Sequence, residues 1–86
     1  MRDNSKRREN EKKFGTWDEQ PDGSRRYFYE VLGRHGWKAY YVKEVDASEK
    51  TIKFYQEIYN ENGQLIEIHE KYPKDKGHTK VKGGRL

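Results

Sequence analysis

The sequence predicts an all-β fold: a four-stranded antiparallel meander that forms a curled sheet or half-barrel, with flexible basic N- and C-terminal tails. Runs rich in aromatic and β-branched residues alternate with glycine-containing turns, and a hairpin pattern extends from Thr51 to Tyr72. No amphipathic helical stripe of useful length interrupts these runs. Short strands separated by turn signals are typical of antiparallel sheets.

The composition limits how much of the chain can be buried. The 86 residues are enough for one small domain, and 30% of them are hydrophobic while 40% are charged. The absence of cysteine excludes disulfides and thiolate zinc sites. No apolar run approaches the roughly 18 residues of a membrane span, and the polar N-terminus lacks the apolar centre of a signal peptide. We therefore expect a soluble cytoplasmic protein.

The net charge of +4 is unevenly distributed along the chain. Residues 1–13 carry six basic and three acidic side chains, and residues 71–86 carry six basic and one acidic. Residues 14–70 carry seven basic and eleven acidic side chains. The ends are basic and the body is acidic.

The basic N-terminal segment divides the chain into a tail and a domain. Residues 1–13 have no apolar stripe to hold a helix against a core, so a disordered tail is favoured over a short helix. The domain covers residues 14–82, and residues 83–86 are expected to fray. Phe14 and Trp17 are large enough to dock on the sheet.

Turn residues set the strand boundaries. Pro21-Asp22-Gly23 predicts a turn before the strand Arg26–Leu32, and Gly33–Gly36 separates that strand from Trp37–Val45. The third and fourth strands form the hairpin Thr51 to Tyr72, and Pro73 ends the last of them. A short segment, Thr79 to Val81, is a candidate edge strand.

The hairpin turn fixes the register of the sheet. A two-residue type I′ turn at Asn62-Gly63 would mix apolar and charged residues on both faces. A three-residue loop with Gly63 in a left-handed bulge separates them, so this loop is predicted. The predicted cross-strand pairs are Ile58 with Ile66, Gln56 with Ile68, Ile52 with Tyr72, Tyr59 with Leu65, Glu57 with Glu67, Tyr55 with His69, and Lys53 with Lys71.

Carrying the alternation of side chains through four strands predicts two faces. The core face contains Phe28, Leu32, Trp37, Ala39, Tyr41, Val45, Ile52, Phe54, Ile58, Ile66, Ile68 and Tyr72. The other, which we call the tyrosine face, contains Tyr27, Tyr29, Lys38, Tyr40, Val42, Lys53, Tyr55, Glu57, Tyr59, Glu67, His69 and Lys71. We expect the core face to be covered by curling of the sheet and by an arm containing Phe14 and Trp17, with or without dimerisation.

The tyrosine face predicts a nucleic-acid binding surface. Aromatic rings that stack on bases alternate there with cations that contact phosphates, as in single-strand binding proteins. The basic ends favour the same polyanionic partner. Alternatively, tyrosine is simply a common strand residue, and charged tails keep small proteins soluble. The candidate binding residues are Tyr27, Tyr29, Lys38, Tyr40, Lys53, Tyr55, Tyr59 and Lys71.

A second pattern predicts acid/base chemistry. In the chosen register Glu57 lies opposite Glu67, with His69 two residues along. One such group could deprotonate the ribose 2′-hydroxyl of RNA and another could protonate the leaving oxygen. A salt-bridging surface histidine is the alternative interpretation. Further candidates, at distances that the sequence does not fix, are Arg34, His35 and His78.

Three functions are compatible with the sequence. A binding module for RNA or single strands is favoured; a metal-independent endoribonuclease and a protein-interaction module or homodimer are the alternatives. No metal site or cofactor is expected, because the histidines are scattered and no nucleotide-binding glycine motif is present.

Overall fold

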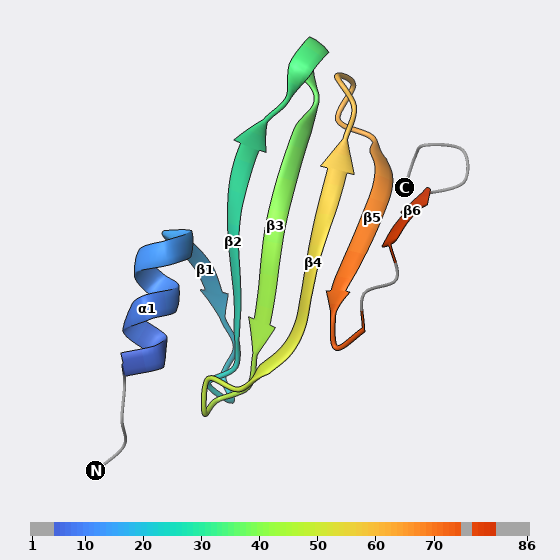
Figure 1. Ribbon diagram of the computed structural model, residues 1–86. Helices are drawn as coiled ribbons and strands as arrows, with labels where there is room; N and C mark the ends of the chain where they lie inside the picture. The colour runs from blue at the N-terminus through green and yellow to red at the C-terminus, as the bar shows by residue number, and fades with distance from the viewer. Residues whose placement is uncertain (1–4, 75–76, 81–86) are drawn as a thin grey trace.

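The computed structural model describes residues 5–74 and 77–80, which form one α-helix and a six-stranded sheet (Figure 1). The elements are α1 (Ser5–Phe14), β1 (Thr16–Glu19), β2 (Arg25–Leu32), a 3-10 turn (Arg34–Gly36), β3 (Lys38–Val45), β4 (Thr51–Tyr59), β5 (Leu65–Tyr72) and β6 (Gly77–Lys80).

The strands form one open antiparallel sheet in which neighbours in sequence are neighbours in space. Figure 1 shows a twisted sheet with β1 and β6 at its edges. The all-β class and the meander order are confirmed, and β2 to β5 match the four predicted strands to within one residue. The predicted strand number is wrong, because β1 and β6 extend the sheet at both edges. The candidate edge strand contributes Thr79 and Lys80 to β6, while Val81 lies outside the described residues.

Strand β1 is stabilised by cations on β2. Glu19 lies opposite Arg25, and the Arg25 Nε donates to its carboxylate at 2.7 Å. The same guanidinium stands 5.1 Å from the ring of Trp17. Ion pairs and cation–π contacts across a strand pair add stability that the strand propensities of single residues do not include. Four exposed residues are therefore enough for an edge strand here.

Helix α1 replaces the tail predicted for residues 1–13, of which residues 5–13 are helical. The helix has no continuous apolar stripe, and polar contacts hold it instead. Arg25 donates to Glu11 at 2.6 Å, and Lys43 donates to Asn10 at 3.0 Å. The helix ends at Gly15, whose left-handed φ of +78° lets its N–H reach the Glu11 carbonyl. The composition did not predict this helix, because the residues that hold it are charged and lie far away in the sequence.

Three turns of the sheet share one geometry. In each, a residue with positive φ follows a tight turn: Gly23 at +88°, Glu49 at +70° and Gly63 at +76°. The Gly63 N–H donates to the Asn60 carbonyl at 3.0 Å, as the Glu49 N–H donates to Asp46 at 2.9 Å. The left-handed conformation predicted for Gly63 is confirmed. Glu49 occupies the position that glycine fills in the other two turns.

Of the cross-strand pairs predicted between β4 and β5, the structure confirms one. Tyr59 lies opposite Leu65 as expected, but a second bulge leaves Ile66 without a partner in the strand ladder and shifts the pairs of Ile58 to Tyr55 by one residue. A further irregularity then places Phe54 opposite Tyr72. Ile58 then faces Glu67, and Glu57 faces Ile68. The other predicted pairs are wrong, because a one-residue slip moves the following side chains, Glu67 to Glu70, to the other face.

The observed register defines two faces that differ from the predicted ones. We call the side on which α1 lies the helix face, and the other the open face. The helix face carries Tyr27, Tyr29, Ala39, Tyr41, Lys43, Val45, Phe54, Gln56, Ile58, Glu67 and His69. The open face carries Arg26, Phe28, Lys38, Tyr40, Val42, Glu44, Lys53, Tyr55, Glu57, Tyr59, Ile68 and Glu70. Strand β2 is therefore turned over relative to the prediction.

The buried cluster of the helix face lies beneath α1, while Val42 and Leu65 are buried on the open face. Phe14 is buried and packs against Tyr27 and Tyr29, with ring centroids 5.8 and 5.4 Å apart. Val45 is buried in the same cluster, against which Phe54 packs. The docking expected of Phe14 is confirmed, whereas Trp17 belongs to β1 and stays partly exposed.

Candidate nucleic-acid interface

The predicted tyrosine face is divided between the two sides of the sheet. Tyr27 and Tyr29 lie on the helix face, where Tyr27 has no exposed surface and is therefore unable to stack on a base. Tyr29 stacks on Tyr41 with centroids 5.1 Å apart. The ammonium of Lys71 lies over the ring of Tyr41 on the same side. The candidates that share the open face are Lys38, Tyr40, Lys53, Tyr55 and Tyr59.

Two tyrosine hydroxyls of the open face donate hydrogen bonds to glutamate carboxylates. The Tyr40 hydroxyl donates to Glu30 at 2.7 Å, and the Tyr55 hydroxyl donates to Glu44 at 2.9 Å. Burial raises the pKa of Tyr55 to about 12, and the Glu44 carboxylate acts in the same direction.

The charge of this face is also unfavourable for a polyanion. The ammonium of Lys53 lies 3.5 Å from a carboxylate oxygen of Glu70. Strands β2 to β5 present three basic and four acidic side chains on this side. The basic ones are Arg26, Lys38 and Lys53, and the acidic ones are Glu30, Glu44, Glu57 and Glu70.

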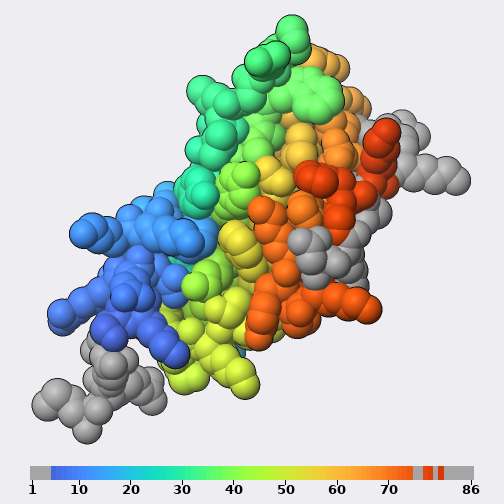
Figure 2. Space-filling view, in the orientation of Figure 1, coloured from blue at the N-terminus to red at the C-terminus, as the bar shows by residue number. Residues whose placement is uncertain are grey.

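A basic groove lies on the helix face, between α1 and the sheet. It encloses about 550 Å³. Four lysines line it together with aromatic side chains: Lys6, Lys13, Lys43 and Lys50 with Phe14, Phe54 and Tyr72. Figure 2 shows the helix (blue) against the β3–β4 turn (yellow-green). These two segments supply Lys6, Lys13 and Lys50, and strand β3 supplies Lys43.

The carboxylates of the groove do not cancel its charge. Glu9 and Glu49 line it, but Glu49 is itself paired with Arg7, whose Nε lies 2.9 Å away. Burial lowers the pKa of Lys43, and the positive charge of Lys13 acts in the same direction, against the smaller opposing effects of Glu49 and Glu9. An ammonium that is disfavoured by burial and by a like charge gains most from an incoming anion. The groove is therefore suited to a phosphate group.

The basic and aromatic character continues from the groove along β4 and β5. The Lys71 ammonium lies 5.8 Å from the ring centroid of Phe54 and 5.2 Å from that of Tyr41. The Tyr41 hydroxyl accepts a hydrogen bond from the Gln56 amide at 3.1 Å. Next along the strand pair, Gln56 lies opposite His69. The helix face thus carries cations, rings and hydrogen-bonding groups in one continuous series.

The observed register of β4 and β5 separates the residues of the predicted acid/base cluster. Glu57 lies on the open face, whereas Glu67 and His69 lie on the helix face. The structure adds His78 of β6, whose Nδ1 lies 3.3 Å from a Glu67 oxygen. The sequence left the position of His78 open because its strand pairing was not predicted. Among the described residues, no group of three or more His, Cys, Asp or Glu side chains is arranged to hold a metal ion.

The other candidate residues lie at the far end of the sheet. Arg34 and His35 form the turn after β2 and line a small apolar pocket with Trp37 and Ile58. The described part of the chain contains no helix of the length and apolarity that crossing a membrane requires.

No protein-family model, curated protein or solved structure matches this chain. The sequence did contain one signal for this site, since the basic N-terminal segment supplies two of its lysines. What was missing was the helix that positions them.

Proposed function

We propose that the protein binds single-stranded RNA on the helix face. The observation that carries this proposal is the groove in which four lysines from α1, β3 and the β3–β4 turn surround exposed aromatic surface. Lysines bind the phosphates, and counterion release from the strand supplies most of the affinity. Rings stack on bases whatever their sequence.

The geometry favours a single strand over a duplex. Tyr72 is 43% exposed and lines the groove, so its ring is available to a base. Bases are available for stacking where they are unpaired, as in single strands and loops of RNA. The proposal moves the binding surface from the open face, which carries most of the residues that the sequence indicated, to the helix face.

A salt titration tests the proposal. Fluorescence anisotropy of a labelled RNA oligonucleotide is measured between about 50 and 200 mM salt, where phosphate contacts weaken steeply. Binding with a negative slope of log affinity against log salt is expected, and Lys50→Gln should reduce that slope by about 0.7. Absence of binding at low salt, or affinity indifferent to salt, would remove the proposal.

A protein-interaction role is the second candidate. At one end of the sheet, Val31 and Trp37 are 42% and 38% exposed and line an apolar pocket, and Leu32 is 72% exposed on the opposite face. Neighbouring apolar side chains on a small protein favour contact with a protein partner or a second copy. Sedimentation of wild type and Leu32→Glu at several concentrations tests self-association, which a concentration-independent monomer would contradict.

A further inference from the structure

Two histidines meet across β5 and β6 on the helix face. His69 lies directly opposite His78, and their ring centroids are 4.3 Å apart. Glu67 lies on the same face as His69, two residues before it, and its carboxylate oxygen is 3.3 Å from Nδ1 of His78. Two imidazoles and a carboxylate are thus held together by strand pairing.

The carboxylate orients one of the two imidazoles. Contact with Glu67 favours a proton on Nδ1 of His78, which leaves Nε2 as the nitrogen that reacts. This is the relationship in which a carboxylate fixes the tautomer and ring position of a catalytic histidine. His78 is 45% exposed, so a substrate can reach it.

The histidine pair lies on the course of the proposed RNA strand. His69 is opposite Gln56, which stands two residues from Phe54 of the basic groove on the same face of β4. Lys71 lies two residues beyond His69, with its ammonium over Phe54. A strand held in the groove therefore continues toward both imidazoles.

We propose that His69 and His78 cleave the bound RNA by general acid/base catalysis, an activity that rests on the RNA binding proposed above. Nε2 of His78 takes the proton of a ribose 2′-hydroxyl, and the oxygen attacks the adjacent phosphorus. The bond from phosphorus to the 5′-oxygen breaks as the imidazolium of His69 gives its proton to that oxygen. The products are a 2′,3′-cyclic phosphate and a free 5′-hydroxyl.

Each group has one role in this reaction. The two imidazoles exchange protons with the reacting oxygens, which leaves His78 protonated and His69 neutral after the bond breaks. Proton exchange with water then returns both to their starting states before the next turnover. The Lys71 ammonium offsets the negative charge that grows on the phosphate oxygens. Glu67 is a positioning residue. No oxidant, reductant or further reactant is consumed.

The test separates cleavage from binding by means of two matched oligonucleotides. One contains a single ribonucleotide within DNA, and the other is entirely deoxy. Wild-type protein in excess EDTA should cut the first at the ribonucleotide, leaving the cyclic phosphate, and should bind the second without cutting it. His69→Gln and His78→Gln should each lower the rate about 100-fold or more while anisotropy shows unchanged binding.

Control variants separate a catalytic from a structural effect. His35→Asn, at a left-handed turn position that asparagine tolerates, should leave the rate unchanged. Glu67→Gln should lower the rate less than either histidine change and shift the pH–rate profile, because it alters the imidazole that it orients. Uridine 3′-monophosphate should shift the NMR signals of both imidazole rings in the wild-type protein.

The outcomes that overturn the inference differ from those that overturn binding. If the ribonucleotide-containing oligonucleotide binds but is not cut, or if wild type and both histidine variants cut it equally, cleavage by the two histidines is refuted and RNA binding stays in place. If neither oligonucleotide binds and none is cut, the proposed function falls as well.

Discussion

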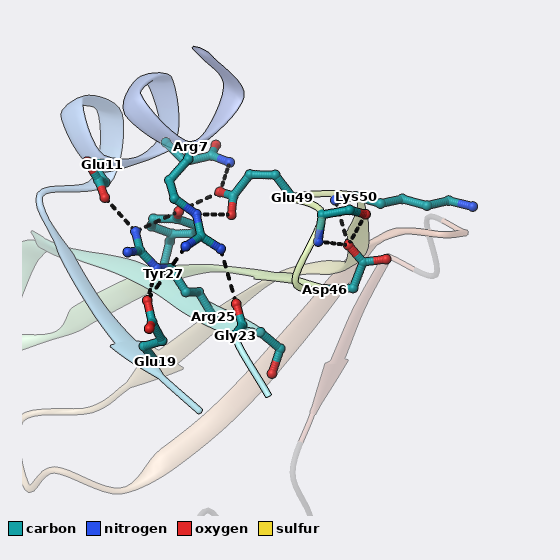
Figure 3. A network of polar contacts seen from close by, with 12 residues as sticks. Arg7, Glu11, Glu19, Gly23, Arg25, Tyr27, Asp46, Glu49 and Lys50 are labelled. Atoms are coloured by element: carbon teal, nitrogen blue, oxygen red, sulfur yellow. Dashed lines mark hydrogen bonds and ion pairs between the residues drawn. The ribbon is translucent and has the colours of Figure 1, made fainter. Parts of the chain in front are cut away.

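The Arg7 Nε donates a hydrogen bond to the Glu49 carboxylate at 2.9 Å, joining α1 to the β3–β4 turn across 42 positions of the sequence (Figure 3). The same carboxylate accepts hydrogen bonds from Asn10 at 3.0 Å and from the Tyr27 hydroxyl. Arg7 also donates to the Gly23 carbonyl at 3.1 Å. One buried carboxylate therefore holds the helix, and with it two of the four groove lysines, against the sheet.

The Glu49 network predicts a stability that falls in acid. Burial opposes ionisation of Glu49, but hydrogen bonds from Tyr27, Asn10 and Arg7 outweigh it and hold its pKa below the ordinary value. The stabilisation is therefore complete above the pKa of an unfolded glutamate and is lost as pH falls through the folded pKa. Glu49→Gln should lower the free energy of unfolding by about 1 to 3 kcal/mol near neutral pH and flatten its acid dependence. Thermal unfolding across the acid range measures this, and parallel curves for the two proteins would contradict it.

The left-handed backbone of Glu49 predicts that two truncations of its side chain differ in the free energy of unfolding. Its φ of +70° belongs to the left-handed region, which costs an L-residue about 1 kcal/mol relative to glycine. Glu49→Ala and Glu49→Gly remove the same hydrogen bonds, but the glycine variant also relieves the strain. Glu49→Gly should therefore unfold with about 1 kcal/mol more stability than Glu49→Ala. Chemical denaturation compares them, and equal midpoints would show that the turn is not strained.

The packing of Phe14 predicts a large loss of stability on truncation. Its ring is 5% exposed and contacts two tyrosines of β2. Phe14→Ala should cost about 3 kcal/mol, because it leaves a cavity under the helix. Leu32→Ala is the matched control: this side chain is 72% exposed and should cost less than about 0.5 kcal/mol. Similar unfolding curves for the two variants would mean that α1 does not contribute to the core.

The lowered pKa of Lys43 predicts pH-dependent RNA binding. Burial and the Lys13 charge disfavour the protonated amine, and a bound phosphate favours it. Affinity should decline as pH rises through the lowered pKa of Lys43, at a lower pH than an ordinary lysine would allow. Lys43→Arg stays charged and should abolish the decline. Anisotropy titrations at several pH values measure it, and identical profiles would exclude Lys43 from the site.

Local signals in the sequence predicted the strands well. A glycine in a turn, such as Gly63, predicts a left-handed backbone conformation at its own position. Runs of β-branched and aromatic residues predict β2 to β5. The register of β5 failed at Ile66, because a bulge in mid-strand leaves no composition signal and inverts the faces of the residues from Glu67 to Glu70. Tyr27 was assigned to the exposed surface for a separate reason: the pairing of Tyr29 with Tyr41 turns β2 over relative to the prediction, and Tyr27 is completely buried.

The candidate site depended on contacts that alternation of residues does not encode. Helix α1 has no apolar stripe that would predict its packing. Glu49 stands at a turn position where glycine is expected, and no sequence pattern indicates that its carboxylate holds the helix. The pairing of His69 with His78 required strand β6, four residues long and preceded by a proline. The basic ends indicated the class of partner, but the face that receives it required the structure.

The most direct test compares two charge-reversed proteins of equal net charge. Lys13→Glu/Lys50→Glu alters exposed lysines of the groove, and Lys38→Glu/Lys53→Glu alters exposed lysines of the open face. Both are titrated against the same labelled single-stranded RNA at the same low salt. The groove variant should lose affinity on the order of tenfold or more, and the open-face variant should lose much less. Equal losses, or a greater loss in the open-face variant, would contradict binding on the helix face.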